Sequence, residues 1–158
     1  MPVEREQFFA LMASFASSVT VITNKSADGV LRGLTASAFV SVSLEPRLCL
    51  VSIDNRSESI ATITDTGKFV VNILSSDQED ISRRFASKIP DKFDGVAYRH
   101  GPATDCPILD GALAWIECKV YQVVPGGDHT LFIGEILDGT ANEGTPLVYF
   151  RGNYRQLA

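Results

Sequence analysis

The spacing of apolar positions predicts a short helix at the start of the chain, followed by a β-hairpin. Apolar residues recur three and four positions apart, which gives a helix one apolar stripe made of Phe8, Leu11, Met12 and Phe15. The β-branched run "VTVIT" at 19–23 precedes the turn sequence "SADG". Residues 19–36 are therefore expected to form a hairpin.

The middle of the chain alternates between strand-like and helix-like segments. The nearly continuous apolar run at 47–53 is typical of a buried strand, and 68–74 has similar composition. Segment 57–67 begins with Ser and ends with Gly, which favours a short helix. Segment 76–87 has acidic residues in its first turn and predicts a second short helix.

The second half of the chain predicts a long loop, a second hairpin and a final strand. Segment 88–110 carries three prolines, two glycines and little periodicity, so it is expected to be a covering or functional loop. The apolar runs at 112–124 and 129–137 are separated by the turn sequence "PGGD", which predicts a hairpin. Residues 146–154 are expected to form the last strand.

Strands therefore outnumber helices, and most arrive as hairpins. The pattern predicts a mainly β protein with one domain over residues 1–158, arranged as an antiparallel barrel with a few short helices. A doubly wound fold requires regular alternation of strands and helices, which the two hairpins interrupt.

Composition narrows the class of function. Hydrophobic residues make up 45% and charged residues 21%, which is ordinary for a globular protein. A net charge of −5 argues against nucleic acid as a partner. No apolar run approaches the roughly 20 residues of a membrane span, and the N-terminus lacks the pattern of a signal peptide. Three cysteines without CxxC spacing indicate reduced thiols in the cytoplasm and no metal site.

The stretch "GLTASAFVSVSLEP" at 33–46 is the first candidate for ligand binding. It places Thr35, Ser37, Ser41 and Ser43 among small apolar residues just before a proline. Small side chains let a flat ligand approach the backbone, while hydroxyl and N–H groups bind carbonyl or phosphate oxygens. Alternation in a half-exposed strand gives the same pattern, so both interpretations stand on these residues alone.

The chain resembles the short-chain flavin reductases, which are the reductase components of two-component flavin monooxygenases. The resemblance extends from about Phe8 to Leu157 and is carried by segments in the same order: "FASSVTVIT", "GLTASAFVSVSLEP", "LVSID", "FVVNIL", "RRFAS", "GGDHTLFIGEI" and "LVYFRGNYRQL". It implies an antiparallel split β-barrel of the FMN-binding type, usually a homodimer with flavin near the subunit interface. Ser17 and Ser18 depart from the family's common "FATGVTVIT".

The resemblance also implies which residues bind the flavin. Those along the isoalloxazine edge are Thr35, Ala36, Ser37 and Ala38, and those that line the flavin site beside it are Ser41, Val42, Ser43 and Leu44. Those near the ribityl and phosphate end are Ser52, Ile53, Asp54, Arg56 and Ser57. A fourth contacting segment contains Arg83, Phe85 and Ala86. A guanidinium such as that of Arg56 pairs well with phosphate, although a solvated arginine in a turn is the alternative. Phe85 fits the buried face of its helix equally well, and only one of Arg83 and Arg84 is expected to face a phosphate.

His129 is the one catalytic residue that the resemblance implies. In similar proteins this histidine lies beside the nicotinamide side of the flavin, where it can bond the nicotinamide or support charge on reduced flavin. The alternative is a histidine bonded to the backbone at the start of a strand. Because adjacent strand residues face opposite sides, Asp128 is expected to bond local backbone and not to orient the His129 ring. Tyr154 is expected to close over the same face or to fill the core, and Trp115 is expected in the core.

The reaction implied is hydride transfer from NAD(P)H to FMN or FAD, with reduced flavin passing to a separate monooxygenase. The sequence has no GxSxG, Walker or GxGxxG motif, so the nicotinamide is expected to meet an open flavin face. Two alternatives remain at this point: a flavoprotein that keeps FMN and transfers electrons, and a non-catalytic barrel that binds flavin or another small molecule.

Overall fold

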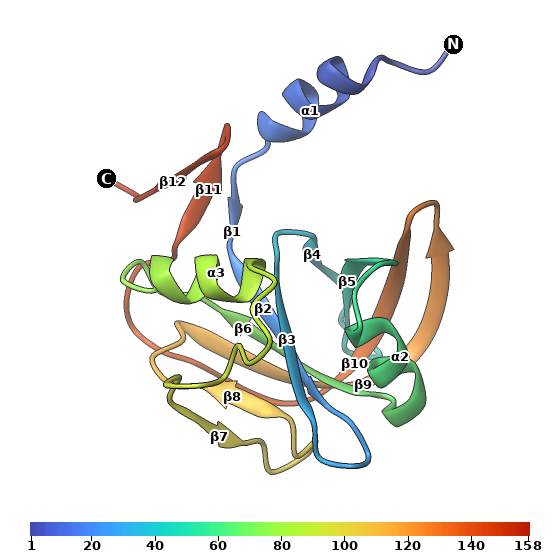
Figure 1. Cartoon of the computed structure of the whole chain (residues 1–158), viewed down its shortest axis with the longest axis vertical. Coiled ribbons are helices and arrows are strands. Elements are labelled where there is room, and N and C mark those ends of the chain that lie inside the picture. The colour runs from blue at the N-terminus through green and yellow to red at the C-terminus, as the bar shows by residue number, and fades with distance from the viewer.

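A computed structural model describes residues 1–158, and its central feature is one seven-stranded antiparallel sheet (Figure 1). The strands lie in the order β3-β2-β6-β9-β10-β5-β4. Their bounds are β2 (Thr20–Lys25), β3 (Leu31–Ala36), β4 (Phe39–Ser43), β5 (Leu48–Asp54), β6 (Lys68–Ile73), β9 (Ala114–Gly126) and β10 (His129–Ala141). The edge strands β3 and β4 do not pair with each other, so the curved sheet is an open, split barrel. This confirms the predicted fold class.

The interior of the barrel is filled by nine buried residues contributed mainly by the sheet. They are Ile22, Cys49, Val51, Ile53, Ile63, Phe69, Val71, Cys118 and Phe132. Helix α2 (Ser59–Thr66) contributes one of them and ends at Gly67, whose φ of +69° suits glycine. The predicted helix at 57–67 and the predicted strands at 47–53 and 68–74 are therefore confirmed.

Gly134 of β10 creates the space in which the largest inner side chains meet. A Cβ atom there would lie 2.7 Å from Cζ of Phe69 and 2.9 Å from Cβ of Cys118. On the same inner face, the sulfur atoms of Cys49 and Cys118 lie 3.6 Å apart. These two residues belong to β5 and β9, the neighbours of β10 on either side.

A second buried cluster lies under helix α3 (Glu79–Ala86), which confirms the helix predicted at 76–87. The loop predicted at 88–110 is only partly irregular, because it contains β7 (Tyr98–His100) and β8 (Pro107–Leu109), which pair with each other. Strands of three residues are too short to show a period in sequence. Fully buried Glu117 holds this segment against β9, since its carboxylate accepts hydrogen bonds from the N–H groups of Ala103 and Thr104.

The chain ends form a small separate sheet. Strand β1 (Ser17–Ser18) pairs with β11 (Val148–Phe150), which pairs with β12 (Asn153–Arg155). The single strand predicted at 146–154 is therefore wrong. Arg151 and Gly152 have φ angles of +49° and +77°, which reverse the chain between two short strands.

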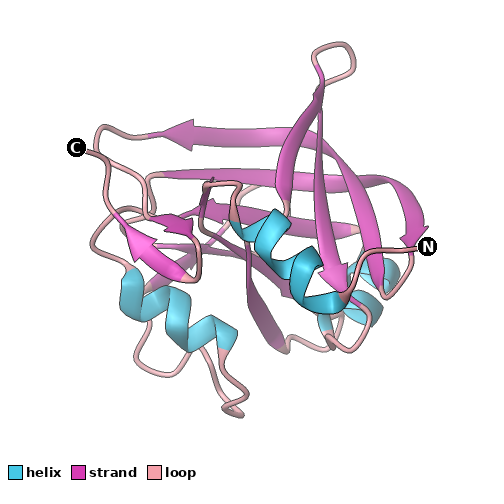
Figure 2. Ribbon diagram, turned by 90° about the horizontal axis from the view of Figure 1, so that it is seen from above, coloured by secondary structure: helices cyan, strands magenta, loops and turns pink.

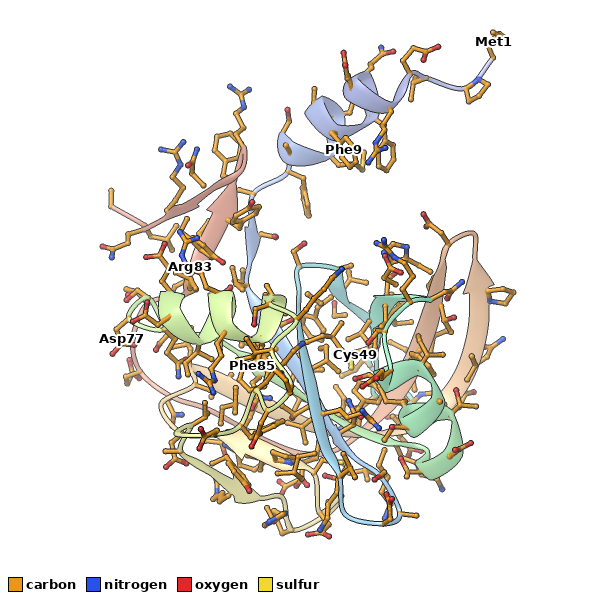
Figure 3. The ribbon with its side chains drawn as sticks, in the orientation of Figure 1. Met1, Phe9, Cys49, Asp77, Arg83 and Phe85 are labelled. Atoms are coloured by element: carbon orange, nitrogen blue, oxygen red, sulfur yellow. The ribbon has the colours of Figure 1, made fainter.

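Helix α1 (Arg5–Ala13) confirms the predicted opening helix, but none of its residues is buried. Figure 1 shows it projecting from the barrel, and Figure 3 shows Phe9 on this helix away from the packed interior. The predicted stripe of Phe8, Leu11, Met12 and Phe15 is exposed along its whole length.

The two predicted hairpins are confirmed as β2–β3 and β9–β10, long strands that Figure 2 shows from above. The turn of the second hairpin is shorter than predicted, since β9 continues to Gly126 and only Gly127 and Asp128 lie between the strands. No helix in the structure has both the length and the apolar character needed to cross a membrane.

Candidate functional site

The junction between β3 and β4 offers unused backbone donors. Thr35 and Ala36 end β3, and Ser37 and Ala38 form the exposed connection to β4. The hydroxyl of Thr35 donates to the carbonyl of Ser82 at 2.6 Å, so it is engaged within the fold. The N–H groups of Ser37 and Ala38 donate no hydrogen bond within the chain. Small side chains leave both of these donors open to a ligand.

A cavity of about 290 Å³ opens beside this connection. Its lining comes from the N-terminal segment, from β2, from the β3–β4 region and from β6: Phe15, Ala16, Ser17, Ser18, Thr20, Ser37, Phe39 and Ile73. Of these, the sequence had singled out only Ser37 as a site residue. The pair Ser17-Ser18, where the sequence departs from the family pattern, therefore lines the same cavity as the candidate flavin segment.

Strand β4 contributes the next group of candidate residues along an open edge of the sheet. Ser41, Val42 and Leu44 are exposed, and Ser43 is half-buried. The register between β4 and β5 shifts between Ser41 and Ser43, which leaves Val42 without a partner in β5. These residues lie on an accessible edge, outside the lining of the cavity.

Strand β5 carries its candidate residues on both faces. Ile53 is fully buried, so its side chain belongs to the core. Ser52 is half-buried, and its N–H donates to the carbonyl of Ala38 at 3.0 Å. This bond ties the end of β5 to the open donors of the β3–β4 connection. Oγ of Ser57 accepts a hydrogen bond from the N–H of Ser59, the first residue of helix α2, at 3.2 Å.

Asp54 and Arg56 form a local ion pair. Nε of Arg56 lies 3.0 Å from Oδ1 of Asp54, Nη2 lies 2.8 Å from Oδ2, and the Arg56 N–H also donates to Oδ1 at 2.8 Å. The hydrogen bonds from Arg56 hold the pKa of Asp54 far below its usual range, and the same pair raises the pKa of Arg56. The Arg56 side chain is 89% exposed, and its Nη1 edge has no partner.

His129 begins β10, and Asp128 lies beside it in the turn. Nδ1 of His129 is 2.7 Å from Oδ1 of Asp128. The prediction that Asp128 bonds only local backbone and does not orient the ring is therefore wrong. Asp128 lies in the turn and not in a strand, so the alternation of strand faces does not apply to it. The hydrogen bond occupies Nδ1 and leaves Nε2 without a partner in the chain.

Helix α3 places its candidate residues in different surroundings. Phe85 is fully buried, and its ring packs edge-on against Phe93 with centroids 5.0 Å apart, so it occupies the core position that the sequence allowed (Figure 3). Arg84 donates to the carbonyls of three residues in the following loop: Asp91, Lys92 and Asp94. Arg83 is exposed and pairs with Glu79 at 2.8 Å, and the next candidate residue, Ala86, is also exposed.

Tyr154 packs against α3 from the C-terminal hairpin. Its hydroxyl lies 2.7 Å from Oγ of Ser82, and the guanidinium carbon of Arg83 lies 4.8 Å from its ring centroid. In Figure 1, β12 and the β9–β10 turn lie on opposite sides of the molecule. Within one chain, Tyr154 lies away from His129 and packs against the second buried cluster, which agrees with the second of the two alternatives that the sequence left open. Trp115 is buried, as predicted.

The site is thus made of open backbone donors, an exposed arginine and an exposed histidine on one sheet. Residues 12–158 match the family described as the flavin reductase like domain. The chain belongs to this flavin reductase family.

Other flavin reductases are similar over nearly the whole chain. A flavin reductase from Pseudomonas putida is 36% identical over 157 residues, which cover 99% of this chain and 92% of the relative. The structure of flavin reductase PheA2 in its native state is 42% identical, covers 99% of both chains and has a TM-score of 0.91. The NADH:FAD oxidoreductase SgcE6 of Streptomyces globisporus, solved with NAD and FAD fragments, is 33% identical with a TM-score of 0.92 and covers 98% of this chain and 93% of that one.

Some members of the flavin reductase family are longer than this chain. The reductase component of the flavin-dependent trigonelline monooxygenase of Acinetobacter baylyi is 40% identical over 141 residues. The match covers 89% of this chain and 45% of that relative. The chain therefore spans about half the length of this relative.

Proposed function

We propose that the protein is an NAD(P)H-dependent flavin reductase that reduces FMN or FAD and supplies reduced flavin to a separate monooxygenase. The observation that carries the proposal is the exposed Ser37–Ala38 backbone, whose two N–H groups have no partner and which borders a cavity in a flavin reductase-type split barrel. Relatives named as flavin reductases and as reductase components of monooxygenases support the same activity.

The residues present fit a flavin. The carbonyl oxygens and ring nitrogens of an isoalloxazine need hydrogen-bond donors next to small side chains, and Ser37 and Ala38 provide them. Just beyond the same end of β5, the unpaired Nη1 edge of Arg56 suits a phosphate. Flavin bound here supplies a ring that accepts a hydride from a reduced nicotinamide.

His129 contributes on the nicotinamide side. With Nδ1 bonded to Asp128, the ring keeps Nε2 available for a hydrogen bond to the carboxamide or for holding a proton near reduced flavin. The contact with the Asp128 carboxylate fixes the orientation of the ring for either of these roles. Positioning and charge are the protein's part of the reaction, and no protein nucleophile is required.

We further propose that the protein acts as a homodimer in the cytoplasm. Helix α1 and the two residues after it expose the apolar side chains of Phe8, Phe9, Leu11, Met12 and Phe15. A helix of nine residues with no buried side chain gains little stability by itself, so a second copy is the partner that would cover it. Phe15 also lines the cavity beside Ser37, so the same interface would lie next to the flavin. The three cysteines are free, which fits a reducing compartment.

The decisive experiment mixes the purified protein with excess FMN or FAD and with NADH or NADPH under anaerobic conditions. Bleaching of many equivalents of flavin supports the proposed reductase. Bleaching of only one equivalent per protein indicates instead a flavoprotein that keeps its FMN. If no combination oxidises the nicotinamide, the protein is a binding barrel and the proposal is wrong.

A further inference from the structure

Asn55, at the end of β5, fastens the turn of the β9–β10 hairpin through three hydrogen bonds. Its N–H donates to the carbonyl of Asp128 at 3.0 Å. Its Nδ2 donates to the carbonyl of Gly127 at 3.4 Å, and its Oδ1 accepts from the hydroxyl of Thr130 at 2.7 Å. One side chain and its own backbone therefore hold three of the four residues from 127 to 130.

His129 is the one residue of this group that has no bond to Asn55, and both of its chain neighbours, Asp128 and Thr130, are bonded to it. Asp128 precedes it and Thr130 follows it, and Asp54, the neighbour of Asn55, is its partner across the strands. The chain around His129 is thus fixed on both sides from the same point on β5.

Packing cannot provide this restraint. The side chains of Asp128 and His129 are 94% and 39% exposed, and Gly127 has a φ of +69° in an open turn. A hairpin turn without buried side chains moves freely unless hydrogen bonds hold it. Strand pairing with Asp54 and Gly126 holds the His129 backbone. The turn before it, and with it the Asp128 carboxylate that contacts the imidazole, is held by the bonds from Asn55.

We propose that Asn55 is a positioning residue that holds His129 toward the nicotinamide. This inference rests on the proposed function, because it assumes that His129 meets the nicotinamide of NAD(P)H. Asn55 itself need not touch either nucleotide. It acts through the backbone of Asp128 and through the hydroxyl of Thr130.

The expected effect is a loss of nicotinamide use with little loss of flavin binding. Removing the two side-chain bonds loosens the turn, and the cost at the nicotinamide is the partial loss of one hydrogen bond from His129. We therefore expect KM for NADH or NADPH to rise about two- to tenfold. The affinity for flavin should change less than twofold, because the Asn55 side chain bonds only Gly127 and Thr130, whereas Arg56 is held by Asp54. The N–H donors of Ser37 and Ala38 have no contact with Asn55.

The test compares Asn55→Ala, Thr130→Val, Thr130→Ser and His129→Ala in the full-length protein. Asn142→Ala is the matched control, since its Nδ2 also donates to a backbone carbonyl, that of Ala112 at 3.1 Å, just beyond the opposite end of β10. For each variant we would measure kcat and KM for the nicotinamide, Kd for the flavin, and Tm. We expect Asn55→Ala and Thr130→Val to raise KM, and Thr130→Ser and Asn142→Ala to match the wild type.

The outcomes separate this inference from the proposed function. If His129→Ala impairs nicotinamide use while Asn55→Ala and Thr130→Val do not, Asn55 has no positioning role, but the reductase proposal stands. If His129→Ala has no effect in an active enzyme, the role of His129 is wrong and that of Asn55 fails with it. If the wild type does not oxidise NAD(P)H, both proposals fail. Should Asn55→Ala lower Tm strongly, Thr130→Val decides, because it removes only one exposed hydroxyl.

Discussion

The ion pair between Asp54 and Arg56 can be tested by its acid–base behaviour. Hydrogen bonds from Arg56 lower the pKa of Asp54 in the folded protein. The pair therefore favours the folded state above the ordinary aspartate pKa of about 3.9, and this contribution is lost as the pH falls through the lower folded value. We expect Arg56→Ala to raise the pKa of Asp54 toward about 3.9. A carboxyl ¹³C NMR titration would detect the change, and an unchanged Asp54 titration would contradict it.

Arg56→Ala should weaken the binding of flavins that carry phosphate but not the binding of riboflavin. The free Nη1 edge of Arg56 is available for one charge-assisted contact to phosphate. We expect the variant to bind FMN about three- to tenfold more weakly and riboflavin with wild-type affinity. Fluorescence titrations with the two flavins measure this, and Arg47→Ala, another arginine in an exposed position, is the control. Equal weakening for both flavins would place the phosphate elsewhere.

His129→Ala should impair nicotinamide use more than flavin affinity. The side chain stands at the start of β10 with Nε2 unpartnered, while the open N–H donors for the flavin lie at Ser37 and Ala38. We expect KM for the nicotinamide to rise about tenfold and flavin Kd to stay within twofold of the wild type, because one partly exposed hydrogen bond is lost. Steady-state kinetics with a flavin titration measures both. Weaker flavin binding with normal turnover of bound flavin would refute this role.

At the level of single residues, the sequence predicted which residues form the candidate site but not which contacts they make. The pair Asp128 and His129 was noticed from its place after two glycines, yet the bond between them depends on a turn conformation that strand periodicity does not describe. The sequence did not indicate a role for Asn55, because asparagine is common in turns of every kind and "SIDNRS" has the composition of an ordinary turn. Its three bonds join segments more than 70 positions apart in the chain and exist only in the folded state.

At the scale of elements, the packing of β10 against the core requires a glycine at position 134, where any side chain would meet Phe69 and Cys118. We expect Gly134→Ala to destabilise the protein by about 1–3 kcal/mol, because its Cβ would overlap Phe69 and Cys118 in a filled core. Urea unfolding followed by fluorescence or circular dichroism measures this. The control is Glu135→Ala, an exposed neighbour on the same strand. Wild-type stability of Gly134→Ala would mean that Phe69 can move aside.

Elements were predictable where the apolar pattern was long enough to show a period. The long hairpins β2–β3 and β9–β10 and helices α2 and α3 follow from such patterns. Strands β7 and β8 have three residues each and lie among prolines, so no period was visible. In "PLVYFRGNY" the apolar run suggested one strand, whereas the positive φ angles of Arg151 and Gly152 divide it into β11 and β12.

On the scale of the whole molecule, the exposed stripe of α1 predicts how the chain assembles. If α1 forms the interface of the proposed homodimer, Phe9→Ser combined with Met12→Ser should give a monomer without lowering the stability of the barrel, because α1 has no buried residue. Light scattering after size exclusion measures the mass, and Glu6→Ser on the same helix is the control. An intact dimer in the double variant would assign the interface to another surface.

The placement of the three cysteines has a consequence for how long the enzyme survives its own chemistry. Reduced flavin released near dioxygen generates peroxide, which attacks exposed thiolates first. All three cysteines are free and buried. The hydrogen bond with Cys49, together with burial, raises the pKa of Cys118, and burial raises that of Cys106. The same hydrogen bond lowers the pKa of Cys49, but that thiol is buried in the barrel. The sulfur atoms of Cys49 and Cys118 lie 3.6 Å apart, beyond the length of about 2.05 Å of a disulfide bond.

The folded protein should therefore resist oxidants that inactivate thiol-dependent enzymes. We expect Ellman's reagent to label no cysteine in the native state and all three only as the protein unfolds. Millimolar peroxide should accordingly leave the activity unchanged over many turnovers. Rapid labelling of a native thiol would show that the barrel opens often enough to admit the reagent. If the protein releases reduced flavin as proposed, the closed core protects it from the peroxide that this flavin generates.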